Sequence, residues 1–289
     1  MNAPDEPLKL SVPIAWQLAH EHCNRNASTG ESCLWNHGLW QLLRLLGLAG
    51  SASNRGEFYR SAIRDCTRGN PAPRILISGT TDYAMLAQVI AAFAGSGSTP
   101  KITVIDICDT PLLLNQWYAD RLSCSLFTVR TDILEYEPAD RFDLVCSDSF
   151  ISRFPHAQWP QLASRWHDLL RPGGTLLTSS KVRPDSGPGP LVFSAEEVVV
   201  FRNAVLEKSL QHGFQSMIGV EDIAVAAEQY AKHQSNHPLQ SAGQLKSLLE
   251  NAGMAVDNLT LNDQKSTHGI RAPTVNSSGK YLYVIAHRP

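Results

Sequence analysis

The 289-residue sequence has no excess of charge of either sign and no cluster of lysine and arginine. Its 25 basic and 27 acidic side chains nearly balance and give a formal net charge of −2. Proteins whose main partner is a nucleic acid usually carry a basic patch or a high isoelectric point. We therefore expect no nucleic acid partner.

Long hydrophobic runs are also absent from the sequence. The longest apolar stretches, at residues 39–49 and 84–95, are shorter than the roughly 20 residues that cross a bilayer, and Arg44 interrupts the first. The first ten residues lack the basic segment and apolar segment of a secretory signal. These two absences predict a cytoplasmic protein that does not bind membranes.

The six cysteines include no C-x-x-C pair, and several lie in apolar segments, as expected for free thiols in a reducing compartment. His20, Cys23, Cys33 and His37 have spacings that could place two helical pairs on one metal ion. However, Trp, Leu and Ser surround them, without the tight turn of a zinc knuckle. We therefore predict no bound metal, and zinc at this set is the alternative.

Helix-like apolar spacing dominates residues 1–70. Helices are expected at 14–23, 34–48 and 56–66, and the sequence Asn-Pro-Ala-Pro at 70–73 predicts the boundary of this helical segment. A hydrophobic content of 43% is enough for a full core, and the length allows one large domain with an appendage.

The pattern beyond residue 73 alternates between strands and helices. Short runs rich in β-formers predict strands at 74–78, 101–106, 125–132, 141–148 and 175–180. Helices are expected between them, at 83–93, 111–122 and 159–170. This alternation predicts an α/β fold with a parallel sheet and right-handed crossovers.

The last third of the chain departs from the alternation and then closes the sheet. Residues 181–190 are rich in Pro and Gly, and 194–233 are expected to be helical, so 181–237 is interpreted as an inserted lid. A helix at 241–252 ends at Gly253, and strands at 255–261 and 280–287 should form a hairpin around the polar loop 262–279.

The first strand-to-helix turn should carry the ligand site, because sheets of this kind bind ligands at the carboxyl ends of their strands. Here the turn begins with Ser78, Gly79 and Thr80 and continues to Asp82. A glycine lets the backbone approach a ligand without a clash at Cβ. We therefore expect these four residues at the site.

Two acids end the next two strands. Asp106 follows the second strand, where a carboxylate can accept hydrogen bonds from ribose hydroxyls. Asp132 ends the third strand, where a side chain can reach an adenine edge. The two positions together predict a nucleoside-containing cofactor.

Five ordered features carry a resemblance to one family: the strand followed by Gly79, the acids Asp106 and Asp132, FDLV at 142–145, and LLRPGGTLL at 169–177. Together they resemble the motifs of class I S-adenosylmethionine-dependent methyltransferases of the small-molecule type. The closing helix, Gly253 and two strands also resemble the end of that family. The resemblance covers about residues 72–180 and 240–289.

The resemblance implies a Rossmann-like seven-stranded sheet at residues 71–289, with a helical cover at 1–70 and the lid at 181–237. It implies S-adenosyl-L-methionine as cofactor and methyl transfer to an O, N or C atom of a small-molecule acceptor; a homodimer is left open. The implied cofactor-binding residues are Ser78, Gly79, Thr80, Asp82, Asp106, Ile107, Asp132, Ile133 and Ser147.

The first loop departs from the family's usual acidic-x-Gly-x-Gly-x-Gly. Ile77 stands in place of the acid, and Thr81 and Tyr83 replace the later glycines. The acid normally holds the methionine amino group of the cofactor. Either Asp82 or backbone carbonyls are expected to hold that group here.

Catalytic residues are harder to predict, because methyl transfer depends largely on holding acceptor and methyl group together in a dry site. A base is needed only if the acceptor must lose a proton. Asp148 and His156, which follow the fourth strand, are the preferred candidates. Lys181 and Arg183, after the fifth strand, are further candidates.

Two other functions stay open at this point. A nicotinamide-dependent oxidoreductase would share the sheet, but the sequence lacks G-x-G-x-x-G and has a closing hairpin. A non-catalytic or regulatory relative is favoured by the irregular first loop. The helix after Ser194 has an apolar face, formed by Phe193, Val198, Phe201, Val205 and Leu206. Together with a helix around 35–46, it is expected to close over the acceptor.

Overall fold

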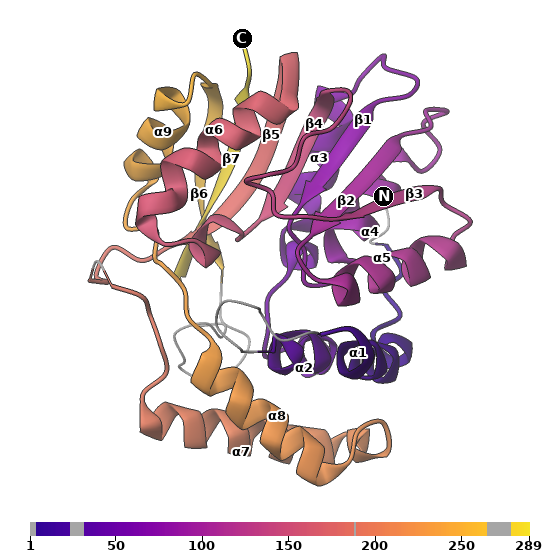
Figure 1. Ribbon diagram of the computed structural model, residues 1–289, viewed down its shortest axis with the longest axis vertical. Coiled ribbons are helices and arrows are strands. Elements are labelled where there is room, and N and C mark those ends of the chain that lie inside the picture. Colours follow the sequence, from indigo (N-terminus) through magenta and orange to yellow (C-terminus); the bar gives the residue numbers. More distant parts are fainter. Residues whose placement is uncertain (1–3, 24–31, 188, 265–278) are drawn as a thin grey trace.

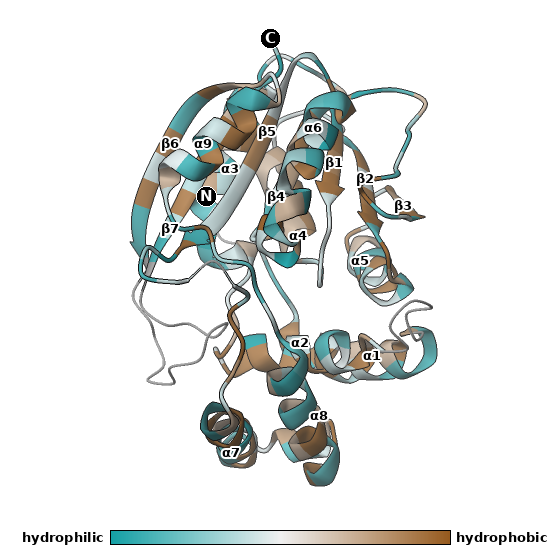
Figure 2. Cartoon of the chain, turned by 60° about the vertical axis from the view of Figure 1, so that its left-hand side comes forward, coloured by the Kyte–Doolittle hydropathy of each residue, from teal (hydrophilic) through white to brown (hydrophobic). Residues whose placement is uncertain are grey.

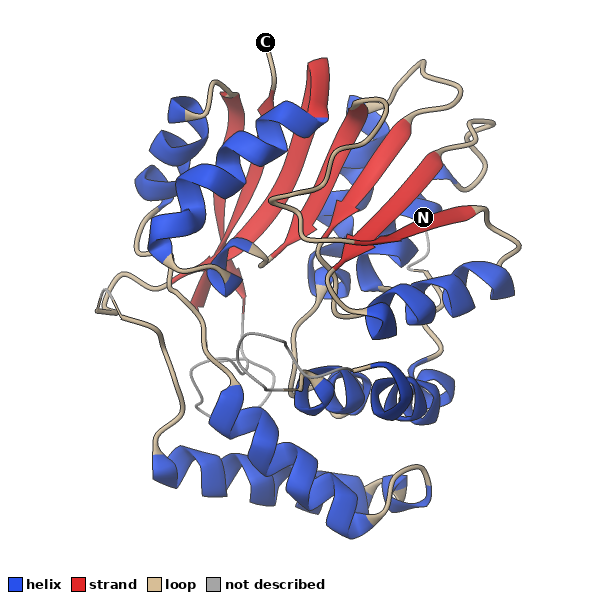
Figure 3. Ribbon diagram, viewed as in Figure 1, coloured by secondary structure: helices blue, strands red, loops and turns tan. Residues whose placement is uncertain are grey.

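The protein is described here by a computed structural model, which defines residues 4–23, 32–187, 189–264 and 279–289. A seven-stranded sheet forms the centre, with helices on both of its faces (Figures 1 and 3). The strand order is β3-β2-β1-β4-β5-β7-β6. This arrangement confirms the predicted α/β fold with seven strands.

The strands are β1 (Arg74–Ser78), β2 (Lys101–Asp106), β3 (Leu126–Arg130), β4 (Phe142–Asp148), β5 (Leu170–Val182), β6 (Ala255–Gln264) and β7 (Gly279–His287). The pairs among β1 to β5 are parallel, and β7 runs antiparallel between β5 and β6. The predicted hairpin of the last two strands is therefore confirmed, although residues 265–278 of its loop lie outside the described residues.

Strand β1 shows why the sheet is covered on both faces. Ile75 and Ile77 pack into one hydrophobic cluster, whereas Leu76 between them packs into a second. Successive side chains of a strand point to opposite faces, so a fully apolar strand needs helices on each side. Figure 2 shows the corresponding apolar colour of the central strands.

Five helices supply the two outer layers. Side chains of the helices α3 (Gly56–Cys66), α4 (Ala84–Phe93) and α5 (Asp109–Arg121) pack on one face. Those of α6 (Trp159–Leu169) and α9 (Ala242–Asn251) pack on the other. Helix α3 therefore belongs to the sheet layers, although the sequence assigned all of residues 1–70 to a cover.

Four further helices lie below the carboxyl ends of the parallel strands (Figure 1): α1 (Leu8–His22), α2 (Leu34–Leu45), α7 (Ala195–Gln211) and α8 (Val220–His233). A third hydrophobic cluster joins Leu39 and Leu43 of α2 to Phe201 of α7 and Tyr230 of α8. The N-terminal helices and the insertion therefore form one cover. Ser194 and Glu197 make the capping box that starts α7.

Strand β5 begins earlier than its sequence predicts. Its assigned range includes the RPGG turn, because Leu170 pairs with Phe142 before the register shifts to Thr175 opposite Leu144. Gly174 is needed here, since a Cβ atom would lie 2.9 Å from the carbonyl oxygen of Phe142.

Among the described residues, none of the helices has both the length and the apolar character of a membrane span.

Candidate active site

A cavity of about 510 Å³ lies between the carboxyl ends of the parallel strands and the helical cover. Residues after β1, β2 and β4 form its sheet side, and residues of α2 and α8 form its cover side. Its volume falls within the roughly 300–1,000 Å³ of typical small-molecule sites. The loops predicted to bind a ligand therefore meet at one cavity.

Most of the predicted cofactor residues line this cavity: Gly79, Thr80, Asp82, Asp106, Ile107, Asp132, Ile133 and Ser147. Ser78 does not. Its buried hydroxyl accepts a hydrogen bond from the Trp166 indole at 3.1 Å. The last residue of β1 points away from the turn that follows it, so its predicted role in binding is corrected to a contact between β1 and α6.

Gly79 has a left-handed backbone with φ of +69°. A Cβ atom at this position would lie 2.2 Å from the ring of Phe150, which also lines the cavity. The turn therefore requires glycine for two reasons, its backbone conformation and the close approach of an aromatic ring. Phe150 could not be predicted from its position, because it follows β4 and reaches Gly79 only in the folded chain.

Asp82 is held by three donors. One carboxylate oxygen accepts hydrogen bonds from the Trp40 indole at 2.9 Å and the Arg44 guanidinium at 2.7 Å. The other oxygen accepts the backbone N–H of Ala84 at 2.8 Å. These contacts attach α2 to the loop after β1. Because the carboxylate of Asp82 already has these partners, they favour the expectation that backbone carbonyls, and not Asp82, hold the cofactor's amino group.

Asp106 and Asp132 stand where their sequence positions predict. The two oxygens of Asp106 accept the backbone N–H groups of Thr80 at 3.1 Å and Cys108 at 2.9 Å. Burial raises the pKa of Asp106 to about 6, although the nearby His37 and these N–H groups oppose the rise. Asp132 accepts the N–H of Leu134 at 2.9 Å, and both carboxylates face the cavity.

Asp148 lines the cavity, and its carboxylate accepts four hydrogen bonds. Arg55 pairs with both oxygens, at 2.7 Å from Nε to Oδ1 and through Nη2 to Oδ2. Oδ1 also accepts the hydroxyls of Tyr59 at 2.9 Å and Ser179 at 2.7 Å. These four contacts hold the carboxylate against its neighbours in the fold, so the arrangement does not favour the predicted catalytic role. It favours a positioning role at the ends of β4 and β5.

His156 is not among the residues that line the cavity. Its Nε2 atom lies 3.1 Å from the carbonyl oxygen of Pro238, and its ring packs edge-on against Trp159. The short helical turn at 156–158 directs the side chain toward the segment that follows α8 and not into the cavity. The catalytic role predicted for His156 is therefore not favoured.

Cationic side chains gather at the end of the cavity formed by β5. Lys181 and Arg183 line it, together with Tyr281 of the neighbouring β7. Burial, together with the charges of Arg183 and Arg55, lowers the pKa of Lys181 to about 7. An amine with this pKa exchanges a proton near neutral pH.

The lid contributes to the cavity through α8 and the segment that follows it, namely Tyr230, Gln234, Asn236 and Pro238, as well as Leu191. No described residue of α7 lines the cavity. Phe201 of α7 instead stacks on the ring of Tyr230, with centroids 5.5 Å apart. The predicted apolar face of α7 therefore supports the wall from behind and does not touch a ligand.

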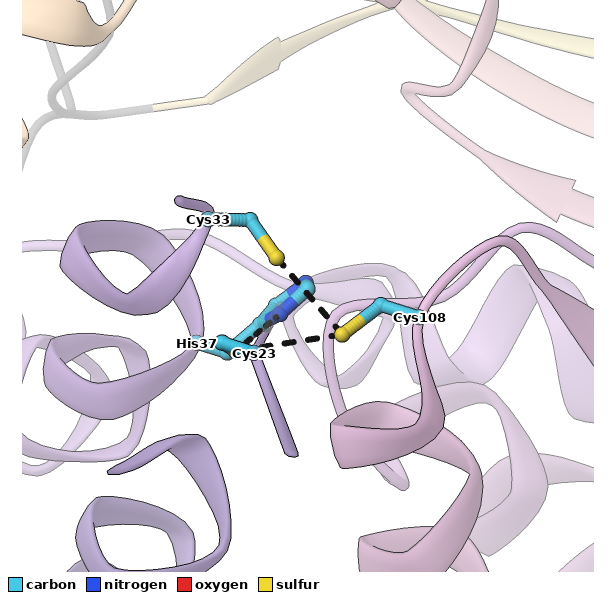
Figure 4. A group of neighbouring side chains, drawn as sticks. All are labelled: Cys23, Cys33, His37 and Cys108. Atoms are coloured by element: carbon cyan, nitrogen blue, oxygen red, sulfur yellow. Dashed lines mark hydrogen bonds between the residues drawn. The ribbon is translucent and has the colours of Figure 1, made fainter. Parts of the chain in front are cut away.

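A cluster of sulfur and nitrogen atoms lies at the cavity (Figure 4), which three of its residues, Cys33, His37 and Cys108, line. Cys23, Cys33, His37 and Cys108 bring their potential ligand atoms within 4.8 Å of one another. His20, which the sequence grouped with three of them, instead hydrogen-bonds the Trp16 carbonyl at 2.8 Å. The prediction of no metal relied on the lack of a compact cluster, and the fold supplies that cluster through Cys108, 71 residues beyond His37.

Comparisons with known proteins support the architecture. No family model matches the sequence. A protein of Arabidopsis thaliana named "probable thiol methyltransferase 2" is 26% identical over 192 residues, covering 65% of this chain and 77% of the relative.

Two solved structures share the fold. Magnesium protoporphyrin IX methyltransferase from Synechocystis, solved with bound S-adenosylhomocysteine, has a TM-score of 0.51, 10% identity, and coverage of 88% of this chain and 96% of that one. A possible exported protein of Bordetella parapertussis has a TM-score of 0.51 and 18% identity, covering 95% and 79% of the two chains.

The sheet order, the closing antiparallel pair and the cavity at the strand ends are those of the class I methyltransferase fold. The chain is thus similar in sequence to one protein named as a methyltransferase and in fold to another. The predicted resemblance to class I S-adenosylmethionine-dependent methyltransferases is therefore supported by one similar sequence and by the fold. Formation of a homodimer stays open, and the cytoplasmic location stays a prediction.

Proposed function

We propose that this enzyme transfers a methyl group from S-adenosylmethionine to a small anionic acceptor bound beside Lys181 and Arg183. The observation that carries the proposal is a single cavity with two chemically different ends. Acidic residues at the ends of β2 and β3 form one end, and the cationic pair at the end of β5 forms the other. The first end suits an adenosine, and the second suits an acceptor with a carboxylate, phosphate or similar group.

The residues at the acidic end fit the cofactor. Asp106 can accept hydrogen bonds from ribose hydroxyls, and Asp132 can accept one from the adenine amino group. Ile107 lies between them in the chain, lines the cavity and is 65% exposed, so it offers an apolar surface to the base. Ser147 adds a buried hydroxyl that has no hydrogen-bond partner among the described residues. A ligand in the cavity would satisfy that hydroxyl.

When bound, S-adenosylmethionine supplies an electrophilic methyl group on a sulfonium. The residues of this chain then have two tasks, to hold the acceptor in line with that methyl group and to receive the proton that the acceptor loses. Arg183 can hold the anionic group. Lys181, neutral in about half of the molecules near pH 7, can take the proton from a thiol, hydroxyl or amine.

The cover excludes water from this reaction. Trp35 and Trp40 of α2 and Tyr230 of α8 line the cavity opposite the sheet. Aromatic side chains bring a large apolar surface to such a wall, and a dry site strengthens the electrostatic interactions inside it. Ligand binding should therefore slow hydrogen exchange in α2 and in the last turn of α8.

The test compares anionic with neutral acceptors of the same nucleophile, for example a thiol acid and its amide, by release of S-adenosylhomocysteine. We expect kcat/KM to favour the anionic member and to rise with pH through about 7, the pKa of Lys181. Lys181→Met should lower kcat by about 10²–10⁴-fold, the usual contribution of a positioned base, and remove this pH dependence.

Lys101→Met is the matched control, because Lys101 is exposed at the first residue of β2, opposite the strand end that faces the cavity. It should leave turnover and the pH profile unchanged. Equal turnover of the two variants would contradict the role of Lys181, and equal use of the acid and the amide would contradict the anionic acceptor. Failure of S-adenosylhomocysteine to bind the wild-type protein in calorimetry would contradict the cofactor assignment.

A further inference from the structure

Three cysteines and a histidine from three separate parts of the chain converge at the junction of cover and core. Cys23 follows the last residue of α1, Cys33 precedes α2, His37 lies in the first turns of α2, and Cys108 precedes α5. Figure 4 shows the sulfur atoms of Cys33 and Cys108 directed toward His37 and Cys23. His37 and Cys108 are buried, and Cys23 and Cys33 are half-buried.

Three separations between these atoms are close to the edges of a tetrahedron around zinc. Zn–S bonds of about 2.3 Å and Zn–N bonds of about 2.0–2.1 Å place two sulfur ligands about 3.8 Å apart, and a sulfur and a nitrogen about 3.6 Å apart. In the structure, Cys108 Sγ lies 3.8 Å from Cys23 Sγ and 3.6 Å from Cys33 Sγ. Cys23 Sγ lies 3.3 Å from His37 Nδ1.

We propose that Cys23, Cys33, His37 and Cys108 bind one Zn²⁺ ion in a closed Cys₃His site. A set of three sulfurs and one imidazole is a common ligand set of structural zinc, and it leaves no open position for a substrate. Zinc binding requires thiolates, so the three thiol protons leave to solvent as the three Zn–S bonds and the Zn–N bond form. No oxidation or reduction takes part.

The surroundings of the cluster suit thiolate ligands. Cys108 stands at the N-terminus of the 13-residue helix α5, where the partial positive charge of the helix favours an anion. The hydroxyl of Thr110, in the first turn of α5, lies 3.1 Å from Cys23 Sγ and can orient it. Such contacts outside the ligand shell fix the direction of metal ligands.

The site would fasten the cover beside the cofactor end of the cavity. Cys23 directly follows α1, and Cys33 directly precedes α2. Cys108 lies two residues after Asp106, the last residue of β2. The N–H of Cys108 donates to Asp106 at 2.9 Å, and Cys33, His37 and Cys108 all line the cavity. One ion would therefore fix both α2 and the loop after β2, independently of which acceptor the enzyme uses.

The first test is metal content, measured by inductively coupled plasma mass spectrometry on untagged protein purified under reducing conditions with zinc in the growth medium. We expect one equivalent of zinc per wild-type chain and less than about a tenth of an equivalent in Cys33→Ser and Cys108→Ser. Cys66→Ser and Cys124→Ser are matched controls, because both cysteines lie outside the cluster, and they should retain one equivalent.

A second measurement needs no variant. Wild-type protein treated with a chelator should lose thermal stability and regain it on addition of Zn²⁺, since a ligand of the native state raises its melting temperature. Replacement of the ion by Co²⁺ should give the intense visible bands of a tetrahedral cobalt thiolate.

Three outcomes would overturn the proposal. The first is reduced wild-type protein that contains no zinc and takes up neither Zn²⁺ nor Co²⁺. The second is zinc that persists in both serine variants of the cluster. The third combines two results. The purified protein has a mass 2 Da lower than expected, which indicates a disulfide within the cluster, and after reduction it binds no metal. None of these readouts depends on methyl transfer, so the proposal can fail while the proposed function holds, and the reverse.

Discussion

Asp148→Asn separates a positioning role from a catalytic one. Arg55 has a side chain with no solvent exposure, and its partner Asp148 is 13% exposed. Removal of one charge from a buried ion pair commonly costs about 3–5 kcal/mol, because the remaining charge stays buried without compensation. Asparagine keeps one oxygen that can accept from Tyr59 and Ser179, so we expect a loss near the lower limit, about 3 kcal/mol.

The loss would appear as a lower melting temperature. For a domain of this size, about 1 kcal/mol corresponds to roughly 2–4 °C, so the melting temperature should fall by about 6–12 °C. Urea denaturation should give the corresponding change in midpoint without a change in slope. The assay therefore needs only purified protein and circular dichroism.

The matched control is Asp140→Asn. Asp140 also pairs with an arginine, Arg74, but its side chain is 66% exposed and that of Arg74 is 35% exposed. An exposed pair contributes about 0–1 kcal/mol, so this variant should melt close to the wild type. If Asp148→Asn is as stable as Asp140→Asn yet loses turnover by more than about 100-fold, Asp148 is a catalytic base and our reasoning is wrong.

Three further predictions concern the cavity. Asp106→Ala should weaken S-adenosylhomocysteine binding by about 1–3 kcal/mol, the cost of leaving polar groups unpaired, and unchanged affinity in calorimetry would remove Asp106 from the cofactor site. Gly79→Ala should destabilise the loop through its positive φ and its clash with Phe150, and full cofactor affinity at wild-type melting temperature would contradict this account. The pKa of Lys181 is about 7 in the folded chain and about 10.4 in the unfolded chain. Between these pH values the unfolded chain binds more protons, so the free energy of unfolding rises from pH 7 toward pH 10. Lys181→Met should therefore be more stable than the wild type at pH 6–7 and lose that advantage as pH rises to 10, and a constant difference in urea titrations would refute the shift.

The cofactor end of the site could be predicted because its residues are local to strand ends. Once the apolar runs define β1, β2 and β3, the chain itself fixes that Gly79, Asp106 and Asp132 follow them. Parallel pairing then brings the three positions to one edge of the sheet, whatever the remaining fold does. The same logic gave the seven strands and the closing hairpin.

Roles that depend on partners distant in sequence could not be predicted in this way. Asp148 ends β4 at a position typical of a catalytic carboxylate. The fold brings Arg55 and Tyr59 to it from 93 and 89 residues away, and these contacts favour a positioning role. His156 lies in a loop near the site, yet its backbone turns the ring toward Pro238. Position along a strand does not specify which donors will reach a side chain.

Sequence alone determined the order of strands and helices and the residues at the strand ends, because local periodicity and turn chemistry decide those. Tertiary structure decided which side chains share an environment. Cys108 gave no signal beside the His/Cys spacing of residues 20–37, and only the packing of α1 and α2 against the start of α5 brings its sulfur to Cys23 and Cys33. A four-ligand cluster is a property of distances between chain segments, and those distances exist only after the cover has packed on the core.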